Sequence, residues 1–413
     1  MLKLQPHLFA AAIAFGLAAC ATTPTVGTPT TASPPPTEAL EVAIDFVLAP
    51  DAFTGMPGWA EADLAPALLA YQRWCAVISR RAVDQPLSNQ ARYGGVVGDW
   101  LPACRAATGL SPQDARAFFE GYFAPARVLA ATGESRLTAY FEPVVEARRT
   151  LQAGFTEPLL TPPRDMVTVD LAGFAAAYDS EALRGAPREL RGILQDGRVR
   201  PYPQRGALPV APGQAFAYAH PADVYQLQVQ GSGRLRFEDG AEVRAAFAAQ
   251  NGYRWRSALG VARDSGLLQS PTWSNFRAYL DSQSPEGVRA ALNADPSYVF
   301  FAEETIGYPN EGPRGAAGVP LTPLGSIAID PAFHPYGALL FVNATYDGGP
   351  FARLLMAQDT GGAIRRGPLR GDLFWGTGTV AGQQAERMNA TGVAFWTLLP
   401  RTLVAMMGED RPH

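Results

Sequence analysis

Three aspartates in the second half of the chain lie where apolar runs begin or end. Asp359 closes one run and leads into the pair Gly361-Gly362. Asp372 opens the next run, and Asp330 closes an earlier one. Short apolar runs bounded by glycine are typical of strands, and functional side chains are often carried where strands end. Three carboxylates brought into one cleft could perform the acid–base chemistry that cleavage of a glycosidic bond requires.

A structural interpretation of the same residues stays open. An aspartate before proline or glycine is often a turn residue that binds backbone N–H groups, and this applies to Asp330 and Asp359. Asp372 differs because it directly precedes Leu373, Phe374 and Trp375. Such apolar neighbours would raise the pKa of its carboxyl above about 3.9, as a general acid near neutrality needs.

Asp359-Thr360-Gly361 is also the triplet of aspartic proteases, whose chemistry needs two carboxylates that share a proton. A symmetric dimer could supply the second carboxylate, but subunits of that kind are far shorter than this chain. We therefore treat a protease as a minor alternative.

The composition indicates a large folded protein without a nucleic-acid or metal signature. With 413 residues, 47% hydrophobic and 17% charged, the chain can bury a substantial core, and we expect two domains. The net charge is −4 and the basic residues form no run, which argues against nucleic-acid binding. The histidines are scattered and no Cys/His cluster has ligand spacing, so we predict no metal and no cofactor.

The N-terminus has the pattern of a lipoprotein signal peptide over residues 1–19. Lys3 precedes an apolar segment, and small residues lead directly to Cys20, where lipidation would anchor the mature protein. An ordinary secretory signal with a chance cysteine is the alternative. Residues 20–40 are rich in Pro, Thr and Ser and predict an extended tether. Because Ala21 and not aspartate follows the cysteine, we expect the periplasmic side of the outer membrane.

Two further cysteines, Cys75 and Cys104, would share this oxidising compartment. They could form a disulfide, or they could be two separately buried thiols. Cys75 lies on the apolar face of a helix that we predict over residues 64–81.

Beyond this helix the pattern predicts mostly helices, with one beginning at Ser111, and then mostly strands after residue 133. Residues 224–230 alternate apolar and polar and form the clearest predicted strand, which runs into Gly231-Ser232-Gly233. Two short helices are expected at 275–280 and 285–292. A small closed β-barrel is predicted from apolar runs at regular spacing, namely 297–301, 325–329, 338–342, 352–356 and 393–398.

Several segments, taken together, resemble the membrane-bound lytic murein transglycosylase A family. The resemblance spans roughly residues 40–405, and the matching segments follow the family's order. These segments are Thr138-Ala139-Tyr140-Phe141-Glu142-Pro143, Gln228-Val229-Gln230-Gly231-Ser232-Gly233, Gln250-Asn251-Gly252, Pro296-Ser297-Tyr298-Val299-Phe300-Phe301 and the three-aspartate region. Two departures are visible. The segment between Asp359 and Asp372 is longer than the family pattern by one or two residues, and Thr138-Ala139-Tyr140 replaces Thr-Gly-Tyr.

The resemblance implies a mainly β fold with flanking α-helices. It would combine a double-psi β-barrel domain with a smaller inserted β domain, separated by a groove for a glycan strand. On this basis we expect barrel-domain residues 41–142 and 265–405, an inserted domain at 143–264, and a tail at 406–413.

The resemblance also implies roles for single residues. Asp372 matches the family's catalytic acid, and Asp359 and Asp330 match its two companion aspartates. Candidates for the substrate groove are Tyr140, Gln230, Ser232, Gly361 and Gly362.

The implied enzyme is a peptidoglycan lytic exotransglycosylase, a carbon–oxygen lyase. It would cleave the β-1,4 bond between N-acetylmuramic acid and N-acetylglucosamine without water, leave 1,6-anhydro-muramic acid ends, and use one aspartate as acid and then as base. A hydrolase on the same fold and a non-catalytic peptidoglycan-binding lipoprotein are the alternatives. The implied partners are peptidoglycan glycan strands, the membrane through Cys20, and other cell-wall enzymes.

Overall fold

A computed structural model describes residues 46–404, apart from 132–134, 185, 309, 363, 365 and 366. The predicted signal peptide, the lipidation site Cys20, the tether and the tail lie outside the described residues. No helix in the described part of the chain is long and apolar enough to cross a membrane.

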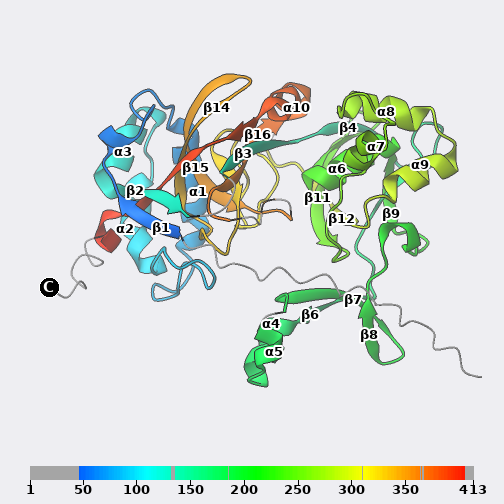
Figure 1. The fold of residues 1–413 in the computed structure, drawn as a ribbon, viewed down its shortest axis with the longest axis horizontal. Coiled ribbons are helices and arrows are strands. Elements are labelled where there is room, and N and C mark those ends of the chain that lie inside the picture. Colours follow the sequence, from blue (N-terminus) through cyan, green and yellow to red (C-terminus); the bar gives the residue numbers. More distant parts are fainter. Residues whose placement is uncertain are drawn as a thin grey trace, which may run out of the picture. The chain divides into compact units, whose positions relative to one another are not determined.

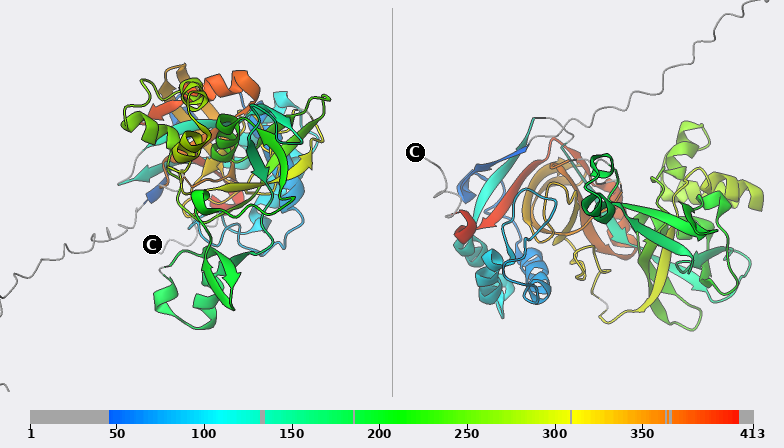
Figure 2. Two further views of the ribbon diagram at one scale, coloured as in Figure 1. Left: turned by 90° about the vertical axis from the view of Figure 1, so that its right-hand side faces the viewer. Right: turned by 90° about the horizontal axis from the view of Figure 1, so that it is seen from below.

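The largest sheet combines strands from the two ends of the chain. Its nine strands follow the order β1-β2-β18-β14-β15-β13-β16-β3-β17, and β3 and β16 pair in parallel although they are far apart in sequence. The strongly curved orange and red strands in Figure 2 belong to it. Its strands are β1 Phe46–Pro50, β2 Phe123–Ala130, β3 Arg136–Glu142, β13 Ser326–Ile329, β14 Leu339–Tyr346, β15 Gly349–Asp359, β16 Arg370–Thr377, β17 Asn389–Thr391 and β18 Ala394–Pro400.

Two further sheets come from the middle of the chain (Figure 1). The six-stranded sheet has the order β12-β11-β10-β4-β9-β5, and the three-stranded sheet has the order β6-β7-β8. Their strands are β4 Val144–Arg148, β5 Glu157–Leu160, β6 Met166–Asp170, β7 Glu189–Gln195, β8 Arg198–Pro201, β9 Ala215–Ala219, β10 Gly233–Arg236, β11 Glu242–Gln250 and β12 Val299–Thr305.

The α-helices occur before β2, within the middle region and after β16. They are α1 Ala65–Ile78, α2 Val97–Ala107, α3 Ala115–Tyr122, α4 Leu171–Ala177, α5 Glu181–Arg184, α6 Pro221–Gln230, α7 Ala258–Asp264, α8 Trp273–Asp281, α9 Pro285–Leu292 and α10 Gly378–Arg387. Short 3-10 helices are η1 Phe53–Gly55, η2 Pro112–Asp114 and η3 Arg205–Ala207.

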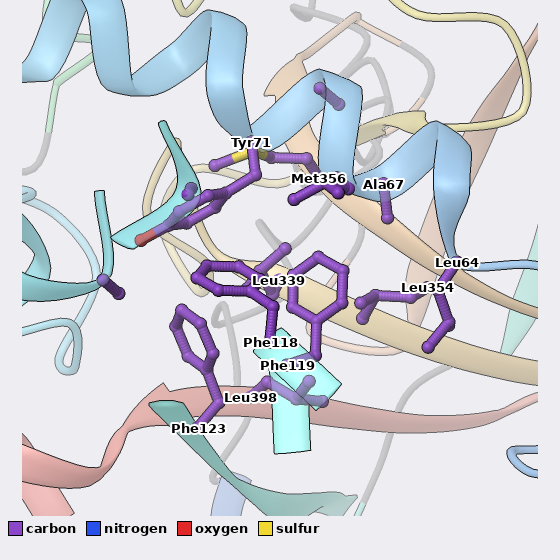
Figure 3. Packing of buried hydrophobic residues seen from close by; sticks show 14 of the residues in the cluster. Leu64, Ala67, Tyr71, Phe118, Phe119, Phe123, Leu339, Leu354, Met356 and Leu398 are labelled. Atoms are coloured by element: carbon purple, nitrogen blue, oxygen red, sulfur yellow. The ribbon is translucent and has the colours of Figure 1, made fainter. Parts of the chain in front are cut away.

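The first helices pack on the large sheet through an aromatic core. Figure 3 shows Tyr71 of α1 and two phenylalanines of α3 among leucines from the strands. Fully burying such side chains contributes about 1.5–3 kcal/mol each. The labelled members are Leu64, Ala67, Tyr71, Phe118, Phe119, Phe123, Leu339, Leu354, Met356 and Leu398.

The two cysteines left open by the sequence form a disulfide. Cys75 of α1 and Cys104 of α2 are bonded, with their Cα atoms 5.4 Å apart. Both side chains are buried in the same core, so the bond joins the two helices from within.

The predicted strand at residues 224–230 is wrong, because this segment is helix α6. His220 caps its N-terminus by accepting from the N–H of Ala222 at 3.2 Å, Pro221 occupies the first turn, and Gly231 ends it in the left-handed conformation. These start and stop signals outweigh the alternation of apolar residues, because the same residues also place an apolar face at helical spacing.

Two other expectations for strands need correction. The run at 297–301, which we assigned to the barrel, leads into β12, and its residues 299–301 pair with β11. The six-stranded sheet therefore continues beyond residue 264, where we expected the inserted domain to end. Strands β1 and β2 also flank the helices of the first part, which we expected to be mostly helical.

Candidate active site

Sheet register brings Asp359 and Asp372 together. Strand β13 lies between β15 and β16, and its Ala328 pairs with Asp359 on one side and with Asp372 on the other. Thr138 of β3 continues the row, because it pairs with Asp372. Side chains at paired positions project from the same face of a sheet. The row therefore gathers two carboxylates from consecutive strands and one hydroxyl from β3, which is distant in sequence.

Asp372 is held by a chain of donors. The guanidinium Nη2 of Arg370 donates to the hydroxyl oxygen of Thr138 at 2.7 Å, and this hydroxyl donates to Asp372 Oδ1. Arg370 can only donate, so the single hydroxyl proton of Thr138 is directed to the carboxylate. The arrangement orients Asp372 and supports its ionised form.

The pKa of Asp372 is raised to about 6, and burial is the largest cause. The hydrogen bond from Thr138 and the charge of Arg370 lower this pKa, and the negative charge of Asp359 raises it. Burial prevails because desolvation penalises the charged carboxylate more than the nearby donors stabilise it. A carboxyl with a pKa near 6 can give up a proton and take it back near neutral pH.

Asp359 accepts from neutral donors on two other segments of the chain. The Tyr140 hydroxyl donates to Oδ2 at 2.8 Å, and the backbone N–H of Ala316 donates to Oδ1 at 3.1 Å. Burial nevertheless raises the pKa of Asp359. The pKa of Tyr140 is raised well above its ordinary value by burial and by both aspartates, so the phenol keeps its proton.

Asp330 performs the turn role that the sequence left open. It lies just after β13 and accepts from the N–H groups of Ala332 at 3.1 Å and Gly367 at 3.3 Å. The contact with Gly367 fixes the segment that leads into β16. The Asp330 side chain thus supports the loop before Asp372 by binding a backbone N–H group of that loop.

His334 braces the same loop, and the sequence gave us no reason to single it out. Its Nδ1 lies 2.6 Å from the Tyr93 hydroxyl, and its Nε2 lies 2.7 Å from the carbonyl oxygen of Pro368. Burial lowers the pKa of His334 to about 4, so the ring is neutral near pH 7. Because a carbonyl only accepts, Nε2 carries the proton and Nδ1 accepts from Tyr93.

The remaining predicted site residues have different surroundings. Gln230 ends α6, and its side-chain oxygen accepts from the N–H of Phe141 at 3.0 Å, which joins this helix to β3. Ser232 is buried. Among the described residues a Cβ on Gly361 or Gly362 would meet no close neighbour, so packing does not explain these glycines.

The structure argues against the protease alternative. We expected a single chain to lack the second triplet that such a protease needs, and this was wrong, because Asp264-Ser265-Gly266 is a triplet of that type. Asp264 ends α7 with a largely exposed side chain and pairs with Arg263 at 2.7 Å. Asp359 is bonded to Tyr140 and to the Ala316 N–H instead, so the two triplets do not form a shared carboxylate pair.

The side chains gathered around Asp359 and Asp372 are suited to proton transfer. Within the described ranges, no three His, Cys, Asp or Glu side chains are grouped to hold a metal ion. The groups present are two neighbouring carboxyls whose pKa values are both raised by burial, a neutral phenol and an oriented hydroxyl.

Comparison with known proteins places this geometry in a family. The model of the MltA specific insert domain matches residues 136–302, and the model of the 3D domain matches residues 325–399. A lytic transglycosylase of Burkholderia pseudomallei, LtgG, is 31% identical, and the match covers 87% of this chain and 98% of that one with a TM-score of 0.56. The chain belongs to the membrane-bound lytic murein transglycosylase A family.

Two other members agree with the assignment. The crystal structure of the membrane-bound lytic murein transglycosylase from Agrobacterium tumefaciens is 28% identical, with a TM-score of 0.71 over 87% of this chain and 99% of that one. Membrane-bound lytic murein transglycosylase A of Escherichia coli strain K12 is 28% identical over 277 residues, which span 64% of this chain and 66% of that protein.

The family assignment confirms the predicted fold class. The chain has the mainly β fold of this family, a double-psi β-barrel with an inserted domain and flanking helices. The groove between the domains and their boundaries stay predictions.

Proposed function

We propose that this chain is a lytic transglycosylase that cleaves the β-1,4 bond between N-acetylmuramic acid and N-acetylglucosamine in peptidoglycan without water. The observation that carries the proposal is Asp372, a buried carboxyl with a pKa of about 6, oriented by Thr138 in a member of this family. The product would be a 1,6-anhydro-muramic acid end. The assignment of Asp372 as the sole acid and base belongs to the proposal.

In the first step Asp372 donates its proton to the glycosidic oxygen. The bond between that oxygen and C1 of the muramic acid breaks, the N-acetylglucosamine leaves with a hydroxyl group, and C1 becomes oxocarbenium-like. The charge of Asp359 favours the protonated form of Asp372 before this step, since it raises the pKa of Asp372.

In the second step Asp372, now a carboxylate, takes the proton from the C6 hydroxyl of the same muramic acid. The C6 oxygen bonds to C1, the 1,6-anhydro ring closes, and Asp372 is protonated again. Because the nucleophile belongs to the same sugar, its effective concentration is high and no positioned water is needed. The Thr138 hydroxyl and Arg370 stabilise the carboxylate between the two steps.

The other site residues receive supporting roles in this proposal. Asp359 and Tyr140 orient the sugar at the cleavage point, and Asp330 holds the loop before β16. Gln230, Ser232, Gly361 and Gly362 would line the glycan groove.

The location of the enzyme is proposed from the N-terminus. A lipid on Cys20 would hold the protein at the periplasmic side of the outer membrane, and the tether of residues 20–40 would let it reach the cell wall. Relatives named membrane-bound support this location.

The test is a digest of purified peptidoglycan by the protein starting after Cys20, analysed by mass spectrometry. We expect muropeptides one water lighter than hydrolysis products. Asp372→Asn should lower kcat by about 10²–10⁴-fold, because general acid–base catalysis is lost. The matched control is Asp264→Asn, which changes an exposed aspartate and should leave cleavage unchanged.

Two results would replace the proposal. Products with reducing ends would indicate a hydrolase on the same fold. Binding of peptidoglycan without cleavage by the wild-type protein would favour the binding lipoprotein.

A further inference from the structure

Two chain segments connect the nine-stranded sheet with the six-stranded sheet. The first crossing passes from β3 to β4 through Pro143, and the second passes from β12 to β13. Between these crossings lies a buried cluster of three charged residues, Glu142, Arg234 and Arg244. We infer that these three are positioning residues of the active site, which hold the two crossings together and thereby set the donors on Asp359. The inference rests on the proposed function.

The cluster is a fully buried carboxylate between two guanidinium groups. Glu142 has no exposed surface, and the two arginines are 6% and 7% exposed. Nε of Arg234 donates to Oε2 of Glu142 at 2.9 Å, and Nε of Arg244 donates to Oε1 at 2.6 Å. Thr377 of β16 adds its hydroxyl to Oε2 at 2.8 Å. The first crossing is therefore bonded to β10, β11 and β16 through one side chain.

The same arginines also bind the second crossing. Nη2 of Arg234 donates to the carbonyl oxygen of Glu311 at 3.1 Å, and Nη2 of Arg244 donates to the same oxygen at 2.8 Å. Each guanidinium thus uses its fixed fork to join a carboxylate on one crossing with a carbonyl on the other. A lysine, which presents a point charge, could not hold both partners in this geometry.

The pairing of the arginines shows why Glu142 is needed. Arg234 and Arg244 lie directly opposite each other on β10 and β11. Like charges at opposite positions of a strand pair repel, and burial strengthens the repulsion. The Glu142 carboxylate between them offsets it. Removing one partner of such a buried pair would leave an uncompensated buried charge.

From the second crossing a short, tightly packed path leads to Asp359. Five residues after Glu311, the N–H of Ala316 donates to Asp359, and the next N–H, of Ala317, donates to the carbonyl oxygen of Gln358 at 2.9 Å. A Cβ on Gly315 would come within 2.5 Å of that same carbonyl oxygen, so this backbone approaches β15 as closely as glycine permits.

From the first crossing the path is a single strand. Tyr140 is two residues before Glu142 on β3, so the two side chains lie on the same face. Tyr140 also donates a hydrogen bond to Asp359. These two donors, which come from outside β15, are thus attached to backbone segments that the arginines join. This couples the cluster to the charge beside Asp372.

The experiment compares Arg244→Gln with Arg236→Gln in the protein starting after Cys20. Arg236 lies on β10 beside Arg234, but it is half exposed and pairs with Glu242 at 2.8 Å, so it is the matched control. Amide hydrogen exchange is measured over residues 311–318, together with kcat and KM on peptidoglycan. We expect Arg244→Gln to speed exchange there by about 10-fold or more and to lower kcat by about 10- to 100-fold with a smaller change in KM. Arg236→Gln should change neither.

A double variant separates positioning from general damage. If the cluster acts through Asp359, Arg244→Gln should lower kcat much less in a protein that already carries Asp359→Asn. Additive effects of the two substitutions, or unchanged exchange at 311–318, would overturn the inference. If Arg244→Gln does not fold, Arg244→Lys keeps the charge but loses the fork, and it should show the faster exchange. Amide exchange is measured independently of activity. A wild-type protein that fails to cleave peptidoglycan would therefore refute the proposed function, while the exchange data would still test whether the cluster holds residues 311–318 in place.

Discussion

The strand pair β3–β16 carries two buried carboxylate sites with opposite surroundings. At one end Asp372 is paired in register with Thr138, and at the other end Glu142 is paired with Thr377. Each carboxylate accepts from the threonine on the opposite strand. Glu142 also accepts from two guanidinium groups, whereas the donor to Asp372 is the hydroxyl, with Arg370 behind it.

The difference separates a chemical role from a structural one. Burial without a directly bonded counter-charge raises the pKa of a carboxyl and makes it able to exchange a proton. Burial between two arginines ties a carboxylate into a network that costs much to break. The same strand pair can therefore supply a candidate acid at one end and a fixed structural contact at the other. Three of the four predictions below test this contrast, and the one on the disulfide gives an independent stability effect for comparison.

The largest expected effect is on the free energy of unfolding when Glu142 is substituted. Glu142→Gln leaves two buried arginines facing each other without a carboxylate, and we expect a loss of about 3–5 kcal/mol in the free energy of unfolding. Denaturant unfolding at neutral pH measures it. The control is Glu242→Gln, which removes a partly exposed partner of Arg236 and should cost about 0–1 kcal/mol. Equal losses in the two variants would show that Glu142 stabilises the fold no more than a partly exposed ion pair does.

The disulfide should contribute slightly less, and independently of both carboxylates. It closes a loop with a sequence separation of 29 residues, for which chain entropy predicts about 3–4 kcal/mol. The variant Cys75→Ala with Cys104→Ala should lower the unfolding free energy by that amount under oxidising conditions. Reduction of the wild-type protein should reproduce the loss. Where the double cysteine variant is folded, its activity should depend on pH in the same way as that of the wild-type protein.

Substitution of Asp372 should stabilise the protein, whereas substitution of Glu142 should destabilise it. The folded-state pKa of Asp372 is about 6, above its ordinary value of 3.8, so the folded state binds the extra proton and stability falls as pH rises between these values. Ionised Asp372 thus costs on the order of 2–3 kcal/mol at pH 7. Asp372→Asn should stabilise the protein by up to that amount at pH 7 and by little at pH 4. A destabilised variant at pH 7 would contradict the role of burial.

The smallest expected effect is a shift in a pH profile. Thr138→Val removes the donor to Asp372, so the pKa of this carboxyl should rise by roughly one unit. An acid must be protonated to act, so kcat/KM falls as pH rises through its pKa, and in the variant this fall should occur at higher pH. Thr345→Val, at an exposed position of β14, is the control. A fall at unchanged or lower pH would argue against the hydrogen bond.

Much of the fold could be predicted from the sequence, and so could Asp372 as the candidate acid, because these depend on local patterns. Helix α9 was predicted at its observed bounds. Asp359 ends β15 and Asp330 directly follows β13, as predicted, whereas Asp372 is the third residue of β16 rather than its first. The error at α6 has a local cause as well. A seven-residue alternation fits a strand and also fits two turns of a helix, and the cap His220 with Pro221 decided between them.

The site's supporting residues could not be predicted, since their partners are far apart in sequence. Thr138 and Asp372 are separated by 234 residues, and Tyr140 and Asp359 by 219. Glu142 was visible as part of a family motif, but its two arginines carry no local signal. Arg234 and Arg236 look alike in the sequence, yet one is buried and the other is half exposed.

The sequence by itself determined which residues can exchange protons, where strands end and which family the chain resembles, because residue chemistry and short-range hydrophobic patterns are written in consecutive positions. The tertiary structure decided what those residues meet. Parallel pairing of β3 with β16 brought Thr138 to Asp372, and the return of the chain after β12 brought an N–H to Asp359. The pKa of a carboxyl depends on burial and on neighbours within a few ångströms, and those neighbours are set by strand pairing rather than by sequence distance.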